Sequence, residues 1–138
     1  MKKRILIIVS AICVLVLGII VWYNSPIDFV DLNPEDVLEI VIFDGNTGNA
    51  LHIKEEEEIE CLIENLNSVR LRRDKISVGY SGYRFKTTIY LTDGEEANGW
   101  NNFIINSNDT VRKDPFFYRV IEGNIDYQYI QSLFDKGK

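Results

Sequence analysis

Six residues in the second half of the chain have the side chains and spacing that anion binding requires. Arg70 and Arg72 alternate on one expected strand, and Arg84 and Lys86 alternate on another. Side chains two positions apart on a strand point to the same face, so each pair is expected to place two cations side by side. With two aromatic residues, they predict a basic strip that binds an anionic envelope polymer or an acidic protein partner. The strip consists of Arg70, Arg72, Tyr80, Arg84, Lys86 and Tyr90.

The charge of the chain is divided unevenly. Residues 24–64 contain 12 acids and one base, whereas residues 65–138 contain 11 bases and nine acids. The net charge of −6 over 138 residues argues against nucleic-acid binding, which needs a basic surface. The acidic first half leaves open an inhibitor or immunity-like protein with a basic target. The basic strip also has a plainer interpretation, since the solvated face of a one-sided sheet normally carries Lys, Arg and Thr.

Catalytic signatures are weak. The single histidine, His52, has no partner motif. Cys61 is surrounded in sequence by four glutamates, which favour the neutral thiol over the nucleophilic thiolate. We therefore predict that the protein is not an enzyme, and we keep a small cell-envelope hydrolase that uses paired carboxylates as an alternative.

Metal-binding signatures are equally weak. One histidine excludes a multi-histidine site within one chain. Asp44, Asn46 and Glu55 match three positions of a calcium loop, but Asn49 stands where that loop needs Gly. A hairpin turn explains the same residues, so we predict neither a metal nor a cofactor.

The N-terminal segment has the composition of a membrane anchor. Residues 5–22 carry no charge, and at 1.5 Å per residue they cover roughly 27 Å, close to the hydrocarbon thickness of a bilayer. Three cations precede this span and acids follow it, so the N-terminus is expected in the cytoplasm. We expect a single-pass cell-membrane protein with a cytoplasmic tip and anchor at 1–23, a tether and helical turn at 24–36, and one extracytoplasmic domain at 37–138.

The remaining pattern predicts an α+β domain, with a mostly antiparallel sheet of about five or six strands packed with two helices. The strands are expected at 37–43, 50–53, 69–72, 83–91, 100–106 and, less regularly, 110–113, and an aromatic turn at 116–118. The helices are expected at 55–67 and at 125–136, the latter with Asn124 as its cap. Helical spacing predicts that Ile59, Leu62, Ile63 and Leu66 are buried and that Cys61 faces solvent.

Several segments carry a resemblance to known proteins. They are residues 79–83, 103–106 and 112–119, together with the turn at 43–48. With them the chain resembles small membrane-anchored or secreted domains of Gram-positive anaerobes that have no assigned function, over most of Val37 to Phe134. The resemblance implies a location and a domain type but no catalytic residue. We expect a non-catalytic binding or sensing module outside the cytoplasm.

Overall fold

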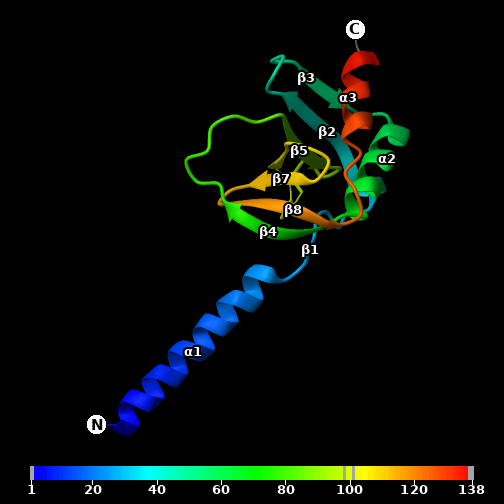
Figure 1. Cartoon of the computed structure of the whole chain (residues 1–138). Coiled ribbons are helices and arrows are strands. Elements are labelled where there is room, and N and C mark those ends of the chain that lie inside the picture. Colours follow the sequence, from blue (N-terminus) through cyan, green and yellow to red (C-terminus); the bar gives the residue numbers. More distant parts are fainter. Residues whose placement is uncertain (1, 98, 101, 137–138) are drawn as a thin grey trace.

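A computed structural model describes residues 2–97, 99–100 and 102–136 of the chain (Figure 1). Asn101, in the strand expected at 100–106, and residues 1, 137 and 138 of the expected cytoplasmic tip and domain lie outside this range. Helix α1, Lys2–Asn24, projects away from the rest of the molecule. It is long and apolar enough to cross a membrane, and by the same criteria it could be a signal sequence.

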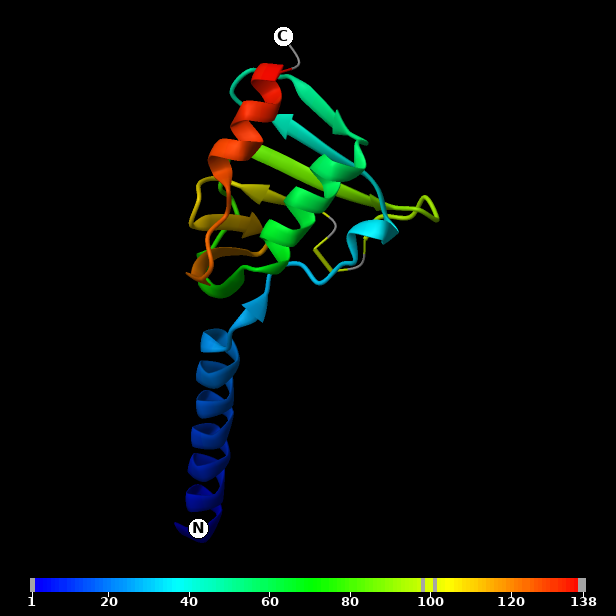
Figure 2. The ribbon, with the colours of Figure 1, turned by 90° about the vertical axis from the view of Figure 1, so that its right-hand side faces the viewer.

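The remaining chain forms one antiparallel sheet of eight strands in the order β1-β4-β8-β7-β6-β5-β2-β3. The strands are β1 Ile27–Asp28, β2 Val37–Asp44, β3 Ala50–Ile53, β4 Arg70–Ile76, β5 Phe85–Leu91, β6 Asn102–Ile105, β7 Thr110–Lys113 and β8 Phe116–Glu122. Helices α2, Glu56–Asn67, and α3, Tyr127–Lys136, lie side by side across one face of the sheet (Figure 2). A short 3-10 helix, η1, spans Pro34–Asp36. The predicted α+β architecture is confirmed.

The expected strand number of five or six is too low, because β1 and β8 were not predicted. The expected aromatic turn at 116–118 is wrong: these residues open β8, which lies between β7 and β4. Tyr118 packs in the core, and Phe117 is buried on the opposite side of the strand. With apolar side chains on both faces, β8 lacks the alternation that identifies a half-buried strand. Strand β4 also continues to Ile76, four residues beyond its expected end.

Helix α2 forms as its sequence predicts. Three acids occupy its first turn, where their negative charges interact favourably with the helix dipole and stabilise the helix. Ile59, Leu62, Ile63 and Leu66 are buried, and Cys61 is exposed, so both expectations are confirmed. In α3, the capping role passes from Asn124 to Asp126, whose carboxylate accepts a hydrogen bond from the Tyr129 amide at 3.0 Å. The helix accordingly begins at residue 127.

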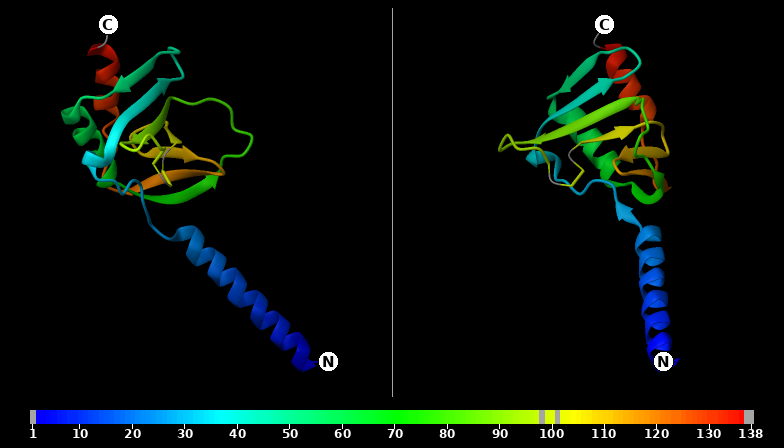
Figure 3. Two further views of the ribbon diagram at one scale, coloured as in Figure 1. Left: turned by 180° about the vertical axis from the view of Figure 1, so that it is seen from behind. Right: turned by 90° about the vertical axis from the view of Figure 1, so that its left-hand side faces the viewer.

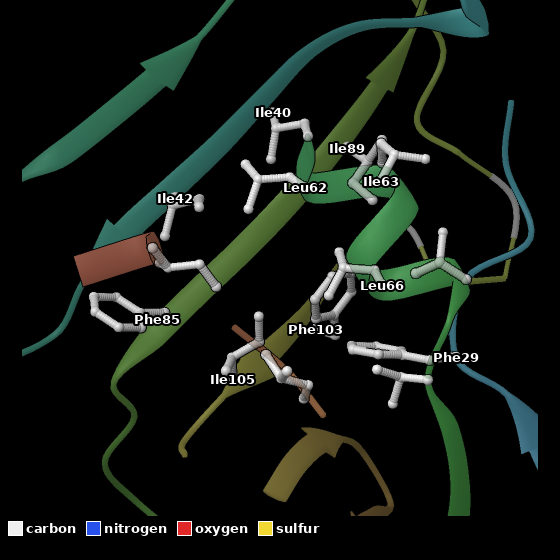
Figure 4. Packing of buried hydrophobic residues seen from close by; sticks show 14 of the residues in the cluster. Phe29, Ile40, Ile42, Leu62, Ile63, Leu66, Phe85, Ile89, Phe103 and Ile105 are labelled. Carbon is white, nitrogen blue, oxygen red and sulfur yellow. The ribbon is translucent and has the colours of Figure 1, made fainter. Parts of the chain in front are cut away.

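The core lies between these two helices and the sheet (Figure 4). Leucine and isoleucine side chains of α2 pack against Ile40 of β2 and Ile89 of β5. Phe85 of β5 stacks on Phe134 of α3, with ring centroids 5.5 Å apart. Each fully buried side chain of this size contributes about 1.5–3 kcal/mol, so this packing fixes which face of the sheet the helices cover.

Residues 24–36, expected to form a tether and a helical turn, contain that turn as η1 and also contribute a strand to the sheet. Strand β1 pairs with β4, and Phe29 is fully buried against Trp100 and Phe103, with ring centroids 5.1 and 4.8 Å away. An apolar pair, Phe29 and Val30, within an acidic stretch is the reason that this segment folds onto the sheet.

Candidate functional site

The strand register divides the sheet residues between two faces. Phe85, Phe103 and Ile105 point into the core under the helices. Lys86 is paired with Ile104, and Ile104 is paired with Arg112. Paired residues point to the same side and neighbours alternate, so these three share the face opposite the helices. We call this side of the sheet the open face.

The open face contains a hollow of about 430 Å³ over β5, β6 and β7. Its lining combines three cations, one carboxylate, an amide and aromatic or aliphatic side chains. The lining residues are Tyr83, Lys86, Asn102, Phe103, Ile104, Arg112, Lys113 and Asp114. Three cations against one acid give the hollow an excess of positive charge, which favours an anionic ligand.

One wall of the hollow is the loop at 77–84 between β4 and β5. Arg112 donates hydrogen bonds from Nη1 to the carbonyl oxygens of Tyr80 and Gly82, at 3.2 and 3.1 Å. Its Nε lies 3.5 Å from the Asp114 carboxylate, and only 12% of its side chain is exposed. The backbone of Ser77 donates to the Pro115 carbonyl at 2.8 Å. These contacts hold the loop against the sheet, so Arg112 acts mainly as the support of the wall.

The two lysines of the hollow have different environments. Lys86 is exposed, and within the described part of the chain its ammonium has no ion-pair partner. The Lys113 Nζ donates to the Asn102 carbonyl at 3.3 Å and lies 5.7 Å from the centroid of the Trp100 ring. Burial lowers the pKa of Lys113, against the opposing influence of Glu96.

Arg84 does not lie beside Lys86, contrary to the sequence interpretation. Strand β5 begins at Phe85, so Arg84 occupies the bend before it and does not follow the alternation of the strand. Its guanidinium turns to the helix side, where Nη1 lies 2.7 Å from the carboxylate of Asp44 and Nε donates to the hydroxyl of Tyr127 at 3.1 Å. The Asp44 side chain is only 4% exposed. This buried pair connects β2, β5 and α3.

The other residues of the predicted strip are also dispersed. Arg70 and Arg72 lie on β4, separated from β5 by three strands. Arg70 contacts the carboxylates of Asp28 and Glu122, at 3.2 and 3.6 Å. Arg72 is exposed on the open face beside Arg119 of β8. Of the six predicted residues, the structure therefore places only Lys86 in the lining of the hollow.

The two aromatic residues of the strip are also apart. Tyr80 is in the 77–84 loop, with its ring edge-on to Phe117 at 5.0 Å. Tyr90 is near the far end of β5, paired with Glu39. Sequence reasoning missed Asn102, Arg112 and Lys113 as site residues. The Arg112-Lys113 dipeptide on a predicted strand was the available signal, but its proximity to Lys86 depends on the pairing of three strands.

A second, acidic groove of about 740 Å³ lies between η1, β2 and α2. Its charged residues are Glu35, Lys54, Glu56, Glu60 and Glu64. No group of three metal-ligating side chains occurs within the described residues. The Asp44 carboxylate, which starts the calcium-like pattern, accepts hydrogen bonds from the Asn46 amide and the Thr47 hydroxyl as well as from Arg84. These contacts are those of a hairpin turn.

Scans against protein-family models and searches of curated proteins and of solved structures find no match to this chain. The functional argument therefore depends on the geometry and charge of the hollow on the open face and of the acidic groove.

Proposed function

We propose that the protein is a non-catalytic, membrane-anchored binding module that holds an anionic group in the hollow of the open face. The observation that carries this proposal is that Lys86 and Arg112 share the open face over one hollow, whose lining also includes Lys113 and a single carboxylate, Asp114. The ligand class that fits is a phosphate or carboxylate group of an anionic envelope polymer or of an acidic protein partner.

The lining of the hollow is better suited to binding than to catalysis. Its cations come from two strands, β5 and β7, and one of them, Arg112, also fixes the loop wall. Such a site is pre-organised, so ligand binding does not include the entropic cost of ordering the loop. A hydrolase would instead need two carboxylates converging on a substrate, and the hollow contains one.

The proposed location follows from α1. An uncleaved α1 would confine the domain to the cell surface, and the cations at positions 2–4 favour a cytoplasmic N-terminus. The binding module would then face the envelope side of the membrane, where anionic polymers are available.

The proposal can be tested with the full chain in detergent micelles and two probes, polyphosphate and polyglutamate. Lys86→Ser should raise the Kd for the preferred probe roughly tenfold or more, since a hydrogen bond to a charged group is worth about 1.5–3 kcal/mol. Lys54→Ser, which removes an exposed lysine of the acidic groove, is the matched control and should leave the Kd unchanged. Binding should weaken from 0.15 M to 1 M salt, as the Debye length falls from ~8 to ~3 Å. Equal Kd values for both variants would refute the site.

The acidic groove supports a second candidate, the inhibitor or immunity-like protein. Four glutamates and one lysine line it, so a basic protein surface would complement it. Crosslinking on intact cells separates the two: a partner attached beside Glu60 favours the inhibitor, and an anionic polymer attached beside Lys86 favours the binding module.

A further inference from the structure

The last turn of α1 is docked onto the end of the sheet. Arg73 of β4 donates from Nη1 to the Trp22 carbonyl at 2.8 Å, and its guanidinium lies 4.0 Å from the centroid of the Trp22 ring. The Tyr23 hydroxyl donates to the backbone carbonyl of Asp74. The rings of Trp22 and Tyr23 both lie edge-on to Phe116, with centroids 6.1 Å away. These contacts, which we call the Arg73 clamp, fix the direction in which the domain leaves the helix.

The segment after the clamp exposes apolar side chains. Ile76 and Val78 are 68% and 73% exposed, and Tyr80 in the same segment is exposed as well. In Figure 1 and in the left view of Figure 3, β4 and the loop at 77–84 extend back toward the side on which α1 runs. The segment with the exposed apolar residues therefore lies on the same side of the domain as α1.

Cations flank these apolar residues. Arg72 and Lys75 of β4 are exposed, and the Nζ of Lys75 lies 5.6 Å from the centroid of the Tyr80 ring. Arg119 of β8 is exposed as well, with its Nη2 3.4 Å from the Asp74 carboxylate. Apolar residues flanked by cations favour binding to an anionic bilayer surface. The apolar groups insert shallowly, and the cations contact lipid phosphates.

We infer that residues 76–80 rest on the headgroup layer of the membrane that α1 crosses, held there by the Arg73 clamp. With residues 5–22 in the bilayer, Trp22 lies at the interface, where aromatic residues concentrate. The three residues from Arg73 to Ile76 cover about 10 Å of strand, directed sideways and back over α1, so the loop stays near the headgroup layer (Figure 1). This inference depends on an uncleaved α1 and is independent of the ligand of the hollow.

The test uses the full chain in vesicles of phosphatidylcholine and phosphatidylglycerol. In a Cys13→Ala, Cys61→Ser background, a single cysteine is introduced as Val78→Cys and labelled with an environment-sensitive fluorophore. Asn46→Cys, in the exposed β2–β3 turn at the opposite end of the domain, is the matched control. The Val78 label should show blue-shifted emission, quenching by lipids with a headgroup spin label and protection from iodide, and the Asn46 label should show none of these. Equal iodide access at both positions would overturn the inference.

The clamp is tested separately by Trp22→Leu, which keeps α1 apolar and lies outside the core of the domain. The Val78 label should then lose part of its protection from iodide, while the Asn46 label is unchanged. Unchanged protection at Val78 would overturn the role of the clamp. Protection that grows with the protein-to-lipid ratio would overturn the lipid assignment, because it would indicate contact with a second copy of the chain.

Discussion

Two cations that are two residues apart in the sequence end on opposite sides of the sheet. On the helix side, Arg84 is paired with the buried carboxylate of Asp44 and hydrogen-bonded to Tyr127. On the open face, Lys86 lines the hollow and has no ion-pair partner in the described part of the chain. The two have the same formal charge, and their surroundings give them different roles.

The difference shows how burial decides what a charge can do. The cation of a buried ion pair cannot leave its carboxylate to bind a ligand, because the carboxylate would then be desolvated and unpaired. That state is strongly unfavourable. An exposed, unpaired ammonium pays no such cost, so it can bind an anion from solution. Groups on the helix side are expected to govern stability, and groups on the open face are expected to govern binding.

The largest effect is expected for Arg84→Met. It removes the partner of a carboxylate that is 4% exposed, so unfolding free energy should fall by about 3–5 kcal/mol. Lys86→Met, the matched control on the open face, should change it by no more than about 0.5 kcal/mol. Urea denaturation of the full chain in micelles, followed by near-ultraviolet circular dichroism, measures both. Equal losses for the two variants would contradict the assignment of Arg84 to structure.

The double variant Asp44→Asn with Arg84→Met sharpens this result. Removing the buried negative charge together with its partner should recover part of the stability that Arg84→Met loses, since the remaining cost is mainly in hydrogen bonds of the turn. A double variant that is less stable than Arg84→Met alone would show that Asp44 acts chiefly by fixing the turn.

Much of the fold could be predicted from the sequence, and the site could not. Strand β3 and strand β7 match their expected bounds, and the α2 face follows from helical spacing, because local alternation and periodicity determine these features. Arg84 was expected on the same face as Lys86 because the strand was predicted to begin at residue 83, two residues before the start of β5. The hollow joins Lys86 to Lys113 across β6, and that proximity comes from strand order, which no local pattern encodes.

A smaller effect, on the affinity for polyphosphate, is expected when the Lys113 ammonium loses its proton. Burial lowers its pKa below 10.5, so the ammonium is lost at a lower pH than in the unfolded chain. Polyphosphate binding should therefore weaken as the pH rises through this lowered value, and binding should be accompanied by proton uptake there. Lys113→Arg, whose guanidinium stays protonated, should keep its affinity to higher pH. Titration calorimetry in buffers of different ionisation enthalpy measures the uptake. Equal pH profiles for both proteins would show that Lys113 does not contact the anion.

On the helix side, titration should instead change stability, and only in alkali. Burial, reinforced by Cys61 and by the Glu58 and Asp126 carboxylates, raises the pKa of Tyr129 from 10.0 to about 12. The unfolded chain then releases the phenolic proton at a lower pH than the folded chain does, so the stabilisation is complete below pH 10 and is lost as the pH rises toward 12. Tyr129→Phe should show a smaller loss of stability between pH 9.5 and pH 11.5 than the unmodified protein, with equal polyphosphate binding at pH 7.

The urea midpoint at these two pH values decides the outcome. The Tyr129→Phe variant should still lose some stability in alkali, because burial also raises the pKa of Tyr118 in the core. The Lys113 proton acts in the opposite direction, since a lysine whose pKa is lowered by folding adds stability as the pH rises through the window just below 10.5. Comparing Tyr129→Phe in the Lys113→Arg background removes that opposing contribution. A Tyr129→Phe profile that parallels the unmodified protein there would place the phenol in water and would refute its burial between α2 and α3.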